Sequence, residues 1–146
     1  MRVAPSFSPS GESGFSRSNV EAGAPAGKKV AVVGPLNVDP SKEYTARYME
    51  AVSTRGMQST IHRHAGPEAW YMLSGSQCLE TSQGIIVARP RHGAVVQAGP
   101  PMLLNTVGKS KRKAVVLVLH DSSQPWVNQA ADWKPKGLCI DAVLNR

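Results

Sequence analysis

The sequence has 146 residues, enough for one domain of ordinary size and hardly for a second. Its formal net charge is +7, yet only 18% of its residues are charged, so it is too apolar for a disordered chain. It has no run of about 18 apolar residues, which excludes a membrane-spanning helix. Two cysteines, Cys78 and Cys139, are too few for a disulfide framework or a thiolate zinc cluster.

The first 27 residues are dominated by Ser, Gly, Pro and Ala and show no apolar period, which predicts a disordered N-terminal arm over residues 1–27. No apolar stretch typical of a secretory signal follows Arg2, so a cytoplasmic location is expected. A leader removed earlier, with a periplasmic location, is the open alternative. The C-terminal segment, residues 127–146, ends in an apolar stretch from Leu138 to Leu144, and we expect it to pack on the main domain as a strand or short helix.

Residues 28–126 carry short apolar or alternating runs, separated by Gly, Pro, Asn and Ser roughly every eight to twelve residues. This punctuation is typical of a β-sandwich or β-barrel, and no amphipathic helical stretch of more than about two turns interrupts it. The sequence therefore predicts an all-β domain. The expected strands are 28–34, 44–52, 58–64, 68–75, 77–84, 85–88, 93–99, 101–108 and 114–120.

One stretch combines metal-ligating side chains at a useful spacing. His62 and His64 are two residues apart on an expected strand, so the pleat directs both imidazoles to the same face. Glu68 follows a turn that can bring its carboxylate back beside them. Two imidazoles and a carboxylate suit divalent iron, manganese, nickel or zinc, and three protein ligands leave coordination positions open, as a catalytic metal requires.

These residues belong to the pattern Gly56-x5-His62-x-His64-x3-Glu68-x6-Gly75, which resembles the first signature motif of the cupin superfamily. The resemblance implies a double-stranded β-helix, or jelly-roll, barrel over residues 28–126 with the site inside it. It also implies that His62, His64 and Glu68 bind the metal. Members of the superfamily commonly form homodimers, so a homodimer is expected here too.

The second cupin motif is degraded. Gln97 stands where the motif has proline, Asn105 comes one residue early, and Met102 stands where the fourth ligand, a histidine, is expected. Thioether sulfur is a weak ligand for metals that prefer imidazole and carboxylate. Four residues are candidates to replace it, although a structural role is the preferred interpretation of the two histidines among them: His120, His92, Tyr48 and Glu50.

Trp70 and Met72 share the Glu68 face of their strand, so they either line the cavity or fill the core. Lys109 to Lys113 form a dense basic cluster without interleaved aromatic residues, which favours a solvated turn over a nucleic-acid site. Cys78 is interpreted as a buried, inert thiol, and a Cys78–Cys139 disulfide is expected only in an oxidising compartment.

Two functions are compatible with these features. The first is a metal-dependent enzyme that acts on a small organic molecule in the barrel, with a mononuclear, dioxygenase-like reaction preferred and isomerase, decarboxylase or lyase chemistry as alternatives that the resemblance implies. The second is a barrel with a degenerate metal site that binds or senses a small ligand without turnover. Neither nucleic acid nor a membrane is an expected partner.

Overall fold

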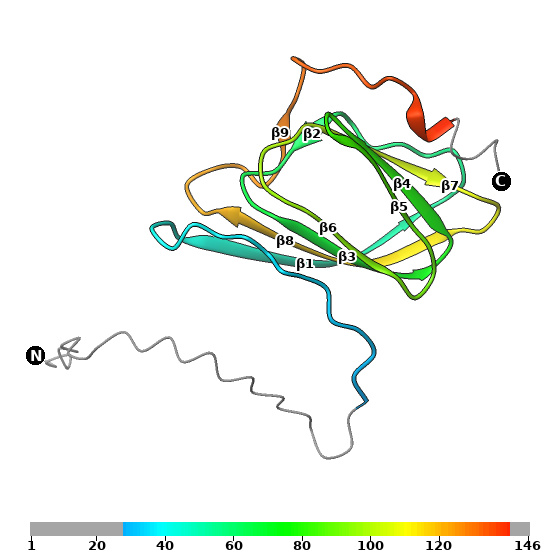
Figure 1. The fold of residues 1–146 in the computed structure, drawn as a ribbon, viewed down its shortest axis with the longest axis horizontal. Helices are drawn as coiled ribbons and strands as arrows, with labels where there is room; N and C mark the ends of the chain where they lie inside the picture. Colours follow the sequence, from blue (N-terminus) through cyan, green and yellow to red (C-terminus); the bar gives the residue numbers. More distant parts are fainter. Residues whose placement is uncertain (1–27, 141–146) are drawn as a thin grey trace, which may run out of the picture.

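The computed structural model describes residues 28–140, so the expected disordered arm over residues 1–27 lies outside the described residues. Two antiparallel β-sheets face each other and enclose a single core (Figure 1). The all-β prediction is confirmed. The strands are β1 (Tyr44–Ser53), β2 (His62–Arg63), β3 (Glu68–Ser74), β4 (Ser76–Thr81), β5 (Gly84–Ala88), β6 (Gly93–Val96), β7 (Met102–Val107), β8 (Arg112–Asp121) and β9 (Asn128–Gln129).

Within each sheet, neighbouring strands often come from distant parts of the sequence. One sheet has four strands in the order β1-β8-β3-β6, and the other has five in the order β5-β4-β7-β2-β9. The longest pairing joins β1 to β8, from Tyr44 opposite Asp121 to Ser53 opposite Arg112. The first long strand therefore pairs with the last one.

The prediction of a strand over residues 28–34 is wrong. This segment forms no ladder, and Val30 and Val32 are exposed. An apolar run becomes a strand only where a neighbouring strand accepts its backbone hydrogen bonds. Instead, the Val33 side chain packs so closely on Gly93 that a Cβ there would lie 2.3 Å from it. The expected strand over 58–64 is likewise reduced to β2 and an isolated bridge at Gln58.

Alternation along the strands builds the core. On β8, every second residue from Arg112 to His120 is buried, whereas the residues between them are half-buried. In an antiparallel pair, directly opposite residues share a face of the sheet, and Glu68 and Trp70 of β3 lie opposite Val118 and Val116. The inward faces thus supply the apolar core. Its buried members are Trp70, Met72, Leu79, Ala88, Val96, Met102, Ala114, Val116 and Val118.

The C-terminal segment runs along the outside of the sheet that contains β2, β4 and β7 (Figure 1). Its strand β9 pairs with β2, and further on Cys139 forms a disulfide with Cys78 of β4. The interpretation of Cys78 as an inert thiol is therefore corrected: Cys78 faces outward from the core, where the returning segment meets it. The main-chain amide of Lys136 also donates to Glu80, two residues further along β4, at 2.5 Å. Within residues 28–140 no helix is long and apolar enough to cross a membrane.

The two outer glycines of the motif both have positive φ angles, +81° at Gly56 and +65° at Gly75, which non-glycine residues rarely adopt. They differ in their surroundings. A Cβ on Gly75 would lie 2.5 Å from the carbonyl oxygen of Lys111 and 2.7 Å from Cα of Arg112, whereas Gly56 has open space around it. Gly75 therefore lets the backbone approach the beginning of β8.

We expect the substitution Gly75→Ala to lower the free energy of unfolding by about 2–4 kcal/mol, because it combines backbone strain with a backbone collision. The matched substitution Gly56→Ala carries the strain alone and should cost about 1 kcal/mol. Urea unfolding of both variants measures the difference. Equal losses would show that the close approach at Gly75 contributes nothing.

Candidate metal centre

The structure brings His62, His64 and Glu68 together at one end of the interior. His62 lies on β2, His64 follows it directly, and Glu68 is the first residue of β3. One donor atom from each lies within 4.8 Å of the others, and Nε2 of His64 is 3.3 Å from an Oε atom of Glu68. The three residues that the motif singles out are thus neighbours in space.

The turn between the histidines and Glu68 is fixed against the end of β8. The amide of Leu119 donates to the carbonyl of Pro67 at 2.9 Å, and the amide of Asp121 donates to that of Ala65 at 2.8 Å. A Cβ on Gly66 would lie 1.8 Å from the carbonyl oxygen of Leu119, so only glycine fits. This docking holds Glu68 beside His64.

Backbone carbonyls orient both imidazoles. His62 Nδ1 donates to the carbonyl of Thr60 at 2.7 Å, and His64 Nδ1 donates to the carbonyl of Trp126. A carbonyl only accepts, so each contact places the ring proton on Nδ1 and leaves the Nε2 lone pair for a ligand bond. Such orienting hydrogen bonds are typical of metal-binding histidines.

The two histidines have different electrostatic surroundings. Burial disfavours the charged form of His62 and lowers its pKa, against the opposing effect of its bond to Thr60. Burial also acts on His64, but the hydrogen bond and the charge of Glu68, with the bond to Trp126, outweigh it and raise the pKa of His64. Glu68 therefore places a negative charge where a proton or a metal cation is favoured.

The donor set fits a divalent transition ion. Bonds from such an ion to imidazole nitrogen and carboxylate oxygen are about 2.0–2.2 Å long, so neighbouring ligand atoms at tetrahedral or octahedral angles lie about 2.8–3.6 Å apart. The 3.3 Å separation of His64 Nε2 and the Glu68 oxygen falls in that range. Among residues 28–140, no other His, Cys, Asp or Glu joins this group.

A cavity of about 310 Å³ adjoins the three residues. This volume is at the small end of the range for organic ligands. Apart from the donor set, its wall is mostly apolar and has one buried cation, Arg112. The lining residues are Met49, Ala51, Ser59, Thr60, His62, His64, Glu68, Leu104, Arg112, Val116, Val118, Trp126 and Val127.

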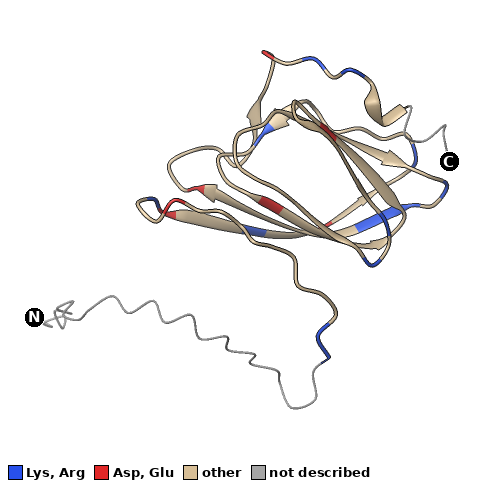
Figure 2. Cartoon of the chain, in the orientation of Figure 1, with Lys and Arg blue, Asp and Glu red and all other residues tan. Residues whose placement is uncertain are grey.

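Arg112 corrects the interpretation of Lys109–Lys113 as a solvated turn. Lys109 and Lys111 are exposed, but Arg112 begins β8 on its inward face and is only 5% exposed. Basic residues are otherwise spread over loops and several strands (Figure 2). The alternation Arg112, Ala114, Val116 in the sequence is the signal that would have placed this side chain inside.

Trp126 is a second cavity residue that sequence reasoning missed. Its ring stacks on that of His64, with centroids 5.9 Å apart and planes inclined by 22°. The ring also contacts Arg47, whose guanidinium carbon lies 5.2 Å from the ring centroid. Trp126 thus contacts His64 through both its ring and its carbonyl.

Two candidate site residues lie elsewhere on the strands that line the cavity. Tyr48 is 75% exposed, because the inward face of β1 carries Met49 and Ala51. His120 is buried on the inward face of β8, but its Nδ1 contacts the backbone carbonyls of Asp121 and Gln124, and the residue does not line the cavity. These backbone contacts are the ones that a structural role for His120 requires.

The other two candidates for the fourth ligand, His92 and Glu50, also lie away from the cavity. His92 is exposed in a turn with its Nδ1 at 3.0 Å from the carbonyl of Pro90, and Glu50 forms a 3.1 Å salt bridge with Lys113. Neither residue lines the cavity.

Trp70, Met72 and Met102 pack in the core rather than against the cavity. Met102 lies directly opposite His62 in the pairing of β2 with β7, so the expected fourth-ligand position is indeed next to the site. Its side chain is buried among apolar residues instead. The structure therefore favours core filling for all three.

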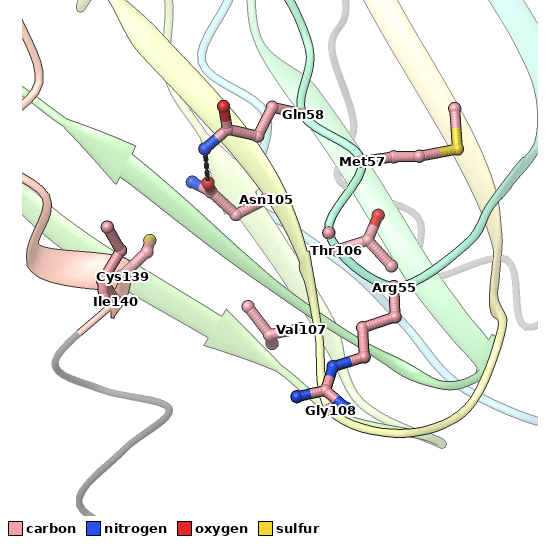
Figure 3. Close-up of a pocket in the computed structure, with 10 residues that line it drawn as sticks. Arg55, Met57, Gln58, Asn105, Thr106, Val107, Gly108, Cys139 and Ile140 are labelled. Carbon is pink, nitrogen blue, oxygen red and sulfur yellow. Dashed lines mark hydrogen bonds between the residues drawn. The ribbon is translucent and has the colours of Figure 1, made fainter.

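Asn105, which belongs to the degraded second motif, lines a second cavity of about 230 Å³ near the disulfide (Figure 3). Its side-chain oxygen accepts a 2.6 Å hydrogen bond from Gln58, which holds the segment before β2 on β7. Arg55 is the only charged residue in the lining of this cavity, and no histidine or carboxylate accompanies it. This cavity therefore offers no set of metal ligands.

Comparison with known proteins identifies the fold. No protein-family model and no curated protein sequence matches this chain. Among solved structures, a cupin-like protein from Thermotoga maritima is similar with a TM-score of 0.52 and 7% identity, over 58% of this chain and 64% of that one. A protein with a double-stranded β-helix domain from Klebsiella pneumoniae has a TM-score of 0.50 and 12% identity, over 65% and 75% of the two chains.

A DMSP lyase from Ruegeria pomeroyi is similar with a TM-score of 0.51 and 16% identity, over 63% of this chain. The match spans only 45% of the lyase. At such identities, structural similarity establishes the fold alone. The chain is a double-stranded β-helix barrel with the cupin fold.

Proposed function

We propose that the chain binds one divalent metal ion through His62, His64 and Glu68 and uses it to act on a small organic molecule in the adjoining cavity. The observation that carries this proposal is that backbone carbonyls fix both imidazoles through Nδ1, beside the Glu68 carboxylate. Ligands fixed before the ion arrives lose little conformational freedom when it binds.

A divalent ion on this donor set supplies a Lewis acid with free coordination positions and, if it is iron, the capacity for oxidation by dioxygen. The chain itself supplies the rest of the site. Glu68 contributes the anionic ligand, and Trp126 covers His64. The wall of the adjoining cavity is mostly apolar and includes Met49 and Leu104. A dioxygenase-like reaction is the preferred form of this activity.

The alternative function is binding of a small ligand without turnover. The observation that favours it is the absence, among the described residues, of a fourth protein ligand, since Met102 packs in the core. Incubating the loaded protein with organic acids and following them by mass spectrometry separates the two functions. A new product supports the enzyme, whereas stoichiometric binding of unchanged ligand supports the binding protein.

The expected homodimer stays a prediction.

Elemental analysis of protein purified without chelator and without added metal tests the proposal. We expect close to one iron, manganese, nickel or zinc ion per chain, and we expect a chelator to remove it and the same ion to restore it. Protein that is empty on isolation and also refuses each of the four ions would contradict the proposal.

A further inference from the structure

Arg112 is a buried cation in the wall of the proposed metal site. Its guanidinium Nε donates to the side-chain oxygen of Gln77 at 2.6 Å, and this is a neutral partner. No carboxylate of the described residues forms a salt bridge with Arg112, and no described residue accepts from its two terminal nitrogens. The four N–H groups on those nitrogens are therefore available to a molecule in the cavity.

The backbone around Arg112 directs its side chain into the interior and not to the protein surface. Gly75 permits the close backbone approach at Arg112, and the inward phase of β8 directs the side chain to the cavity. Gln77 is fully buried and uncharged, so its side-chain oxygen holds Arg112 without neutralising it. Its amide nitrogen has no hydrogen-bond partner among the described residues. A buried charge without a counter-ion is unfavourable, and such groups are retained in sites that bind the opposite charge.

Among the described residues, Glu68 is the one acid whose charge acts on Arg112. Burial lowers the pKa of Arg112, and the charge of Glu68 opposes that effect. When Glu68 ligates a divalent ion, however, its charge is shared with that ion. The loaded site then has a formal charge of about +2, from the ion, one carboxylate and one guanidinium. Such a site favours an anion over a neutral ligand.

We propose that Arg112 is a specificity-determining residue that binds the carboxylate of a small organic acid in the metal cavity. This rests on the proposed function and adds the class of its substrate. The terminal nitrogens of an arginine match the two oxygens of a carboxylate. The apolar wall, with Leu104, Val116 and Val118 among its members, fits an uncharged hydrocarbon body, and the volume of about 310 Å³ keeps that body small.

Calorimetric titration of Zn²⁺-loaded protein with benzoate and with benzamide, its neutral counterpart of the same shape, tests the proposal. We expect benzoate to bind at least about tenfold more tightly than benzamide, because only the anion forms charge-assisted hydrogen bonds. Arg112→Gln should remove this preference and leave the zinc stoichiometry unchanged. Equal binding of the two probes to loaded wild-type protein would overturn the assignment.

Two further variants keep the test sharp if Arg112→Gln fails to fold. Gln77→Glu retains Arg112 but gives it an internal carboxylate, so the preference for benzoate should fall at least about tenfold. Lys113→Gln removes the same charge one residue along, on the outer face where Lys113 pairs with Glu50, and should leave the preference intact. An unchanged preference in Gln77→Glu, or its loss in Lys113→Gln, would contradict the role of Arg112.

The zinc measurement distinguishes failure of this inference from failure of the proposed function. Zinc bound at one ion per chain without a benzoate preference overturns the inference alone. Zinc refused by the wild-type protein, before any benzoate is added, overturns the proposed function and this inference with it.

Discussion

The substitutions His62→Ala and His64→Ala are each expected to weaken metal binding by at least about 100-fold, so that neither variant retains a stoichiometric ion on purification. Each change removes one of the three proposed ligands, and no other His, Cys, Asp or Glu of the described residues joins this group. Equilibrium competition with a chromophoric chelator measures the affinity, and circular dichroism shows whether the barrel is folded. Glu68→Gln should also weaken binding, because it removes the charge and keeps the volume.

His92→Ala is the matched control. His92 also has Nδ1 next to a backbone carbonyl, but it lies in an exposed turn away from the cavity. Its removal should leave the stoichiometry and the affinity of the metal unchanged. If both His62→Ala and His64→Ala keep one ion per chain at wild-type affinity, the ligand assignment is wrong.

The substitution Cys139→Ser is expected to lower the free energy of unfolding by about 2–4 kcal/mol. The disulfide spans 61 residues of sequence, and a crosslink over a loop of this length removes many conformations from the unfolded chain. In the folded protein it fastens the C-terminal segment to β4, beside the hydrogen bond of Lys136 to Glu80. Urea unfolding under non-reducing conditions measures the loss.

Reductant provides the control for this prediction. It should shift the unfolding midpoint of the wild-type protein towards that of Cys139→Ser and leave the variant unaffected. Identical midpoints for the two oxidised proteins would contradict a stabilising role. Disulfides persist in oxidising compartments, so the stabilisation is expected there; the cellular location of the protein stays a prediction.

The metal group is the part of the site that sequence could predict. Its three residues lie on either side of the short turn that joins β2 to β3, so their spacing along the chain translates directly into closeness in space. The strands from β3 to β8 could also be predicted from the sequence, because alternation and turn residues are local signals. The strand expected over 28–34 failed for the opposite reason, since pairing depends on a distant partner.

The remaining walls of the cavity depend on which face of each strand turns inward. Alternation on β1 separates Tyr48 from Met49, but only the pairing of Met49 with Val116 on β8 shows which set is inside. The same ambiguity hid Arg112, whose neighbours in sequence are surface lysines. Trp126 was missed because it is in no strand and meets His64 through the fold alone.

The pairing of β1 with β8 also has a consequence for how the protein is made. Tyr44 can pair with Asp121, and His64 can contact Trp126, only after the later residue of each pair has been synthesised. Contacts this distant in the chain form late and slowly. A nascent chain that includes the motif but not yet β8 therefore contains all three candidate ligands without the barrel that positions them. The three candidate ligands are expected to take up their places only after β8 and Trp126 have left the ribosome.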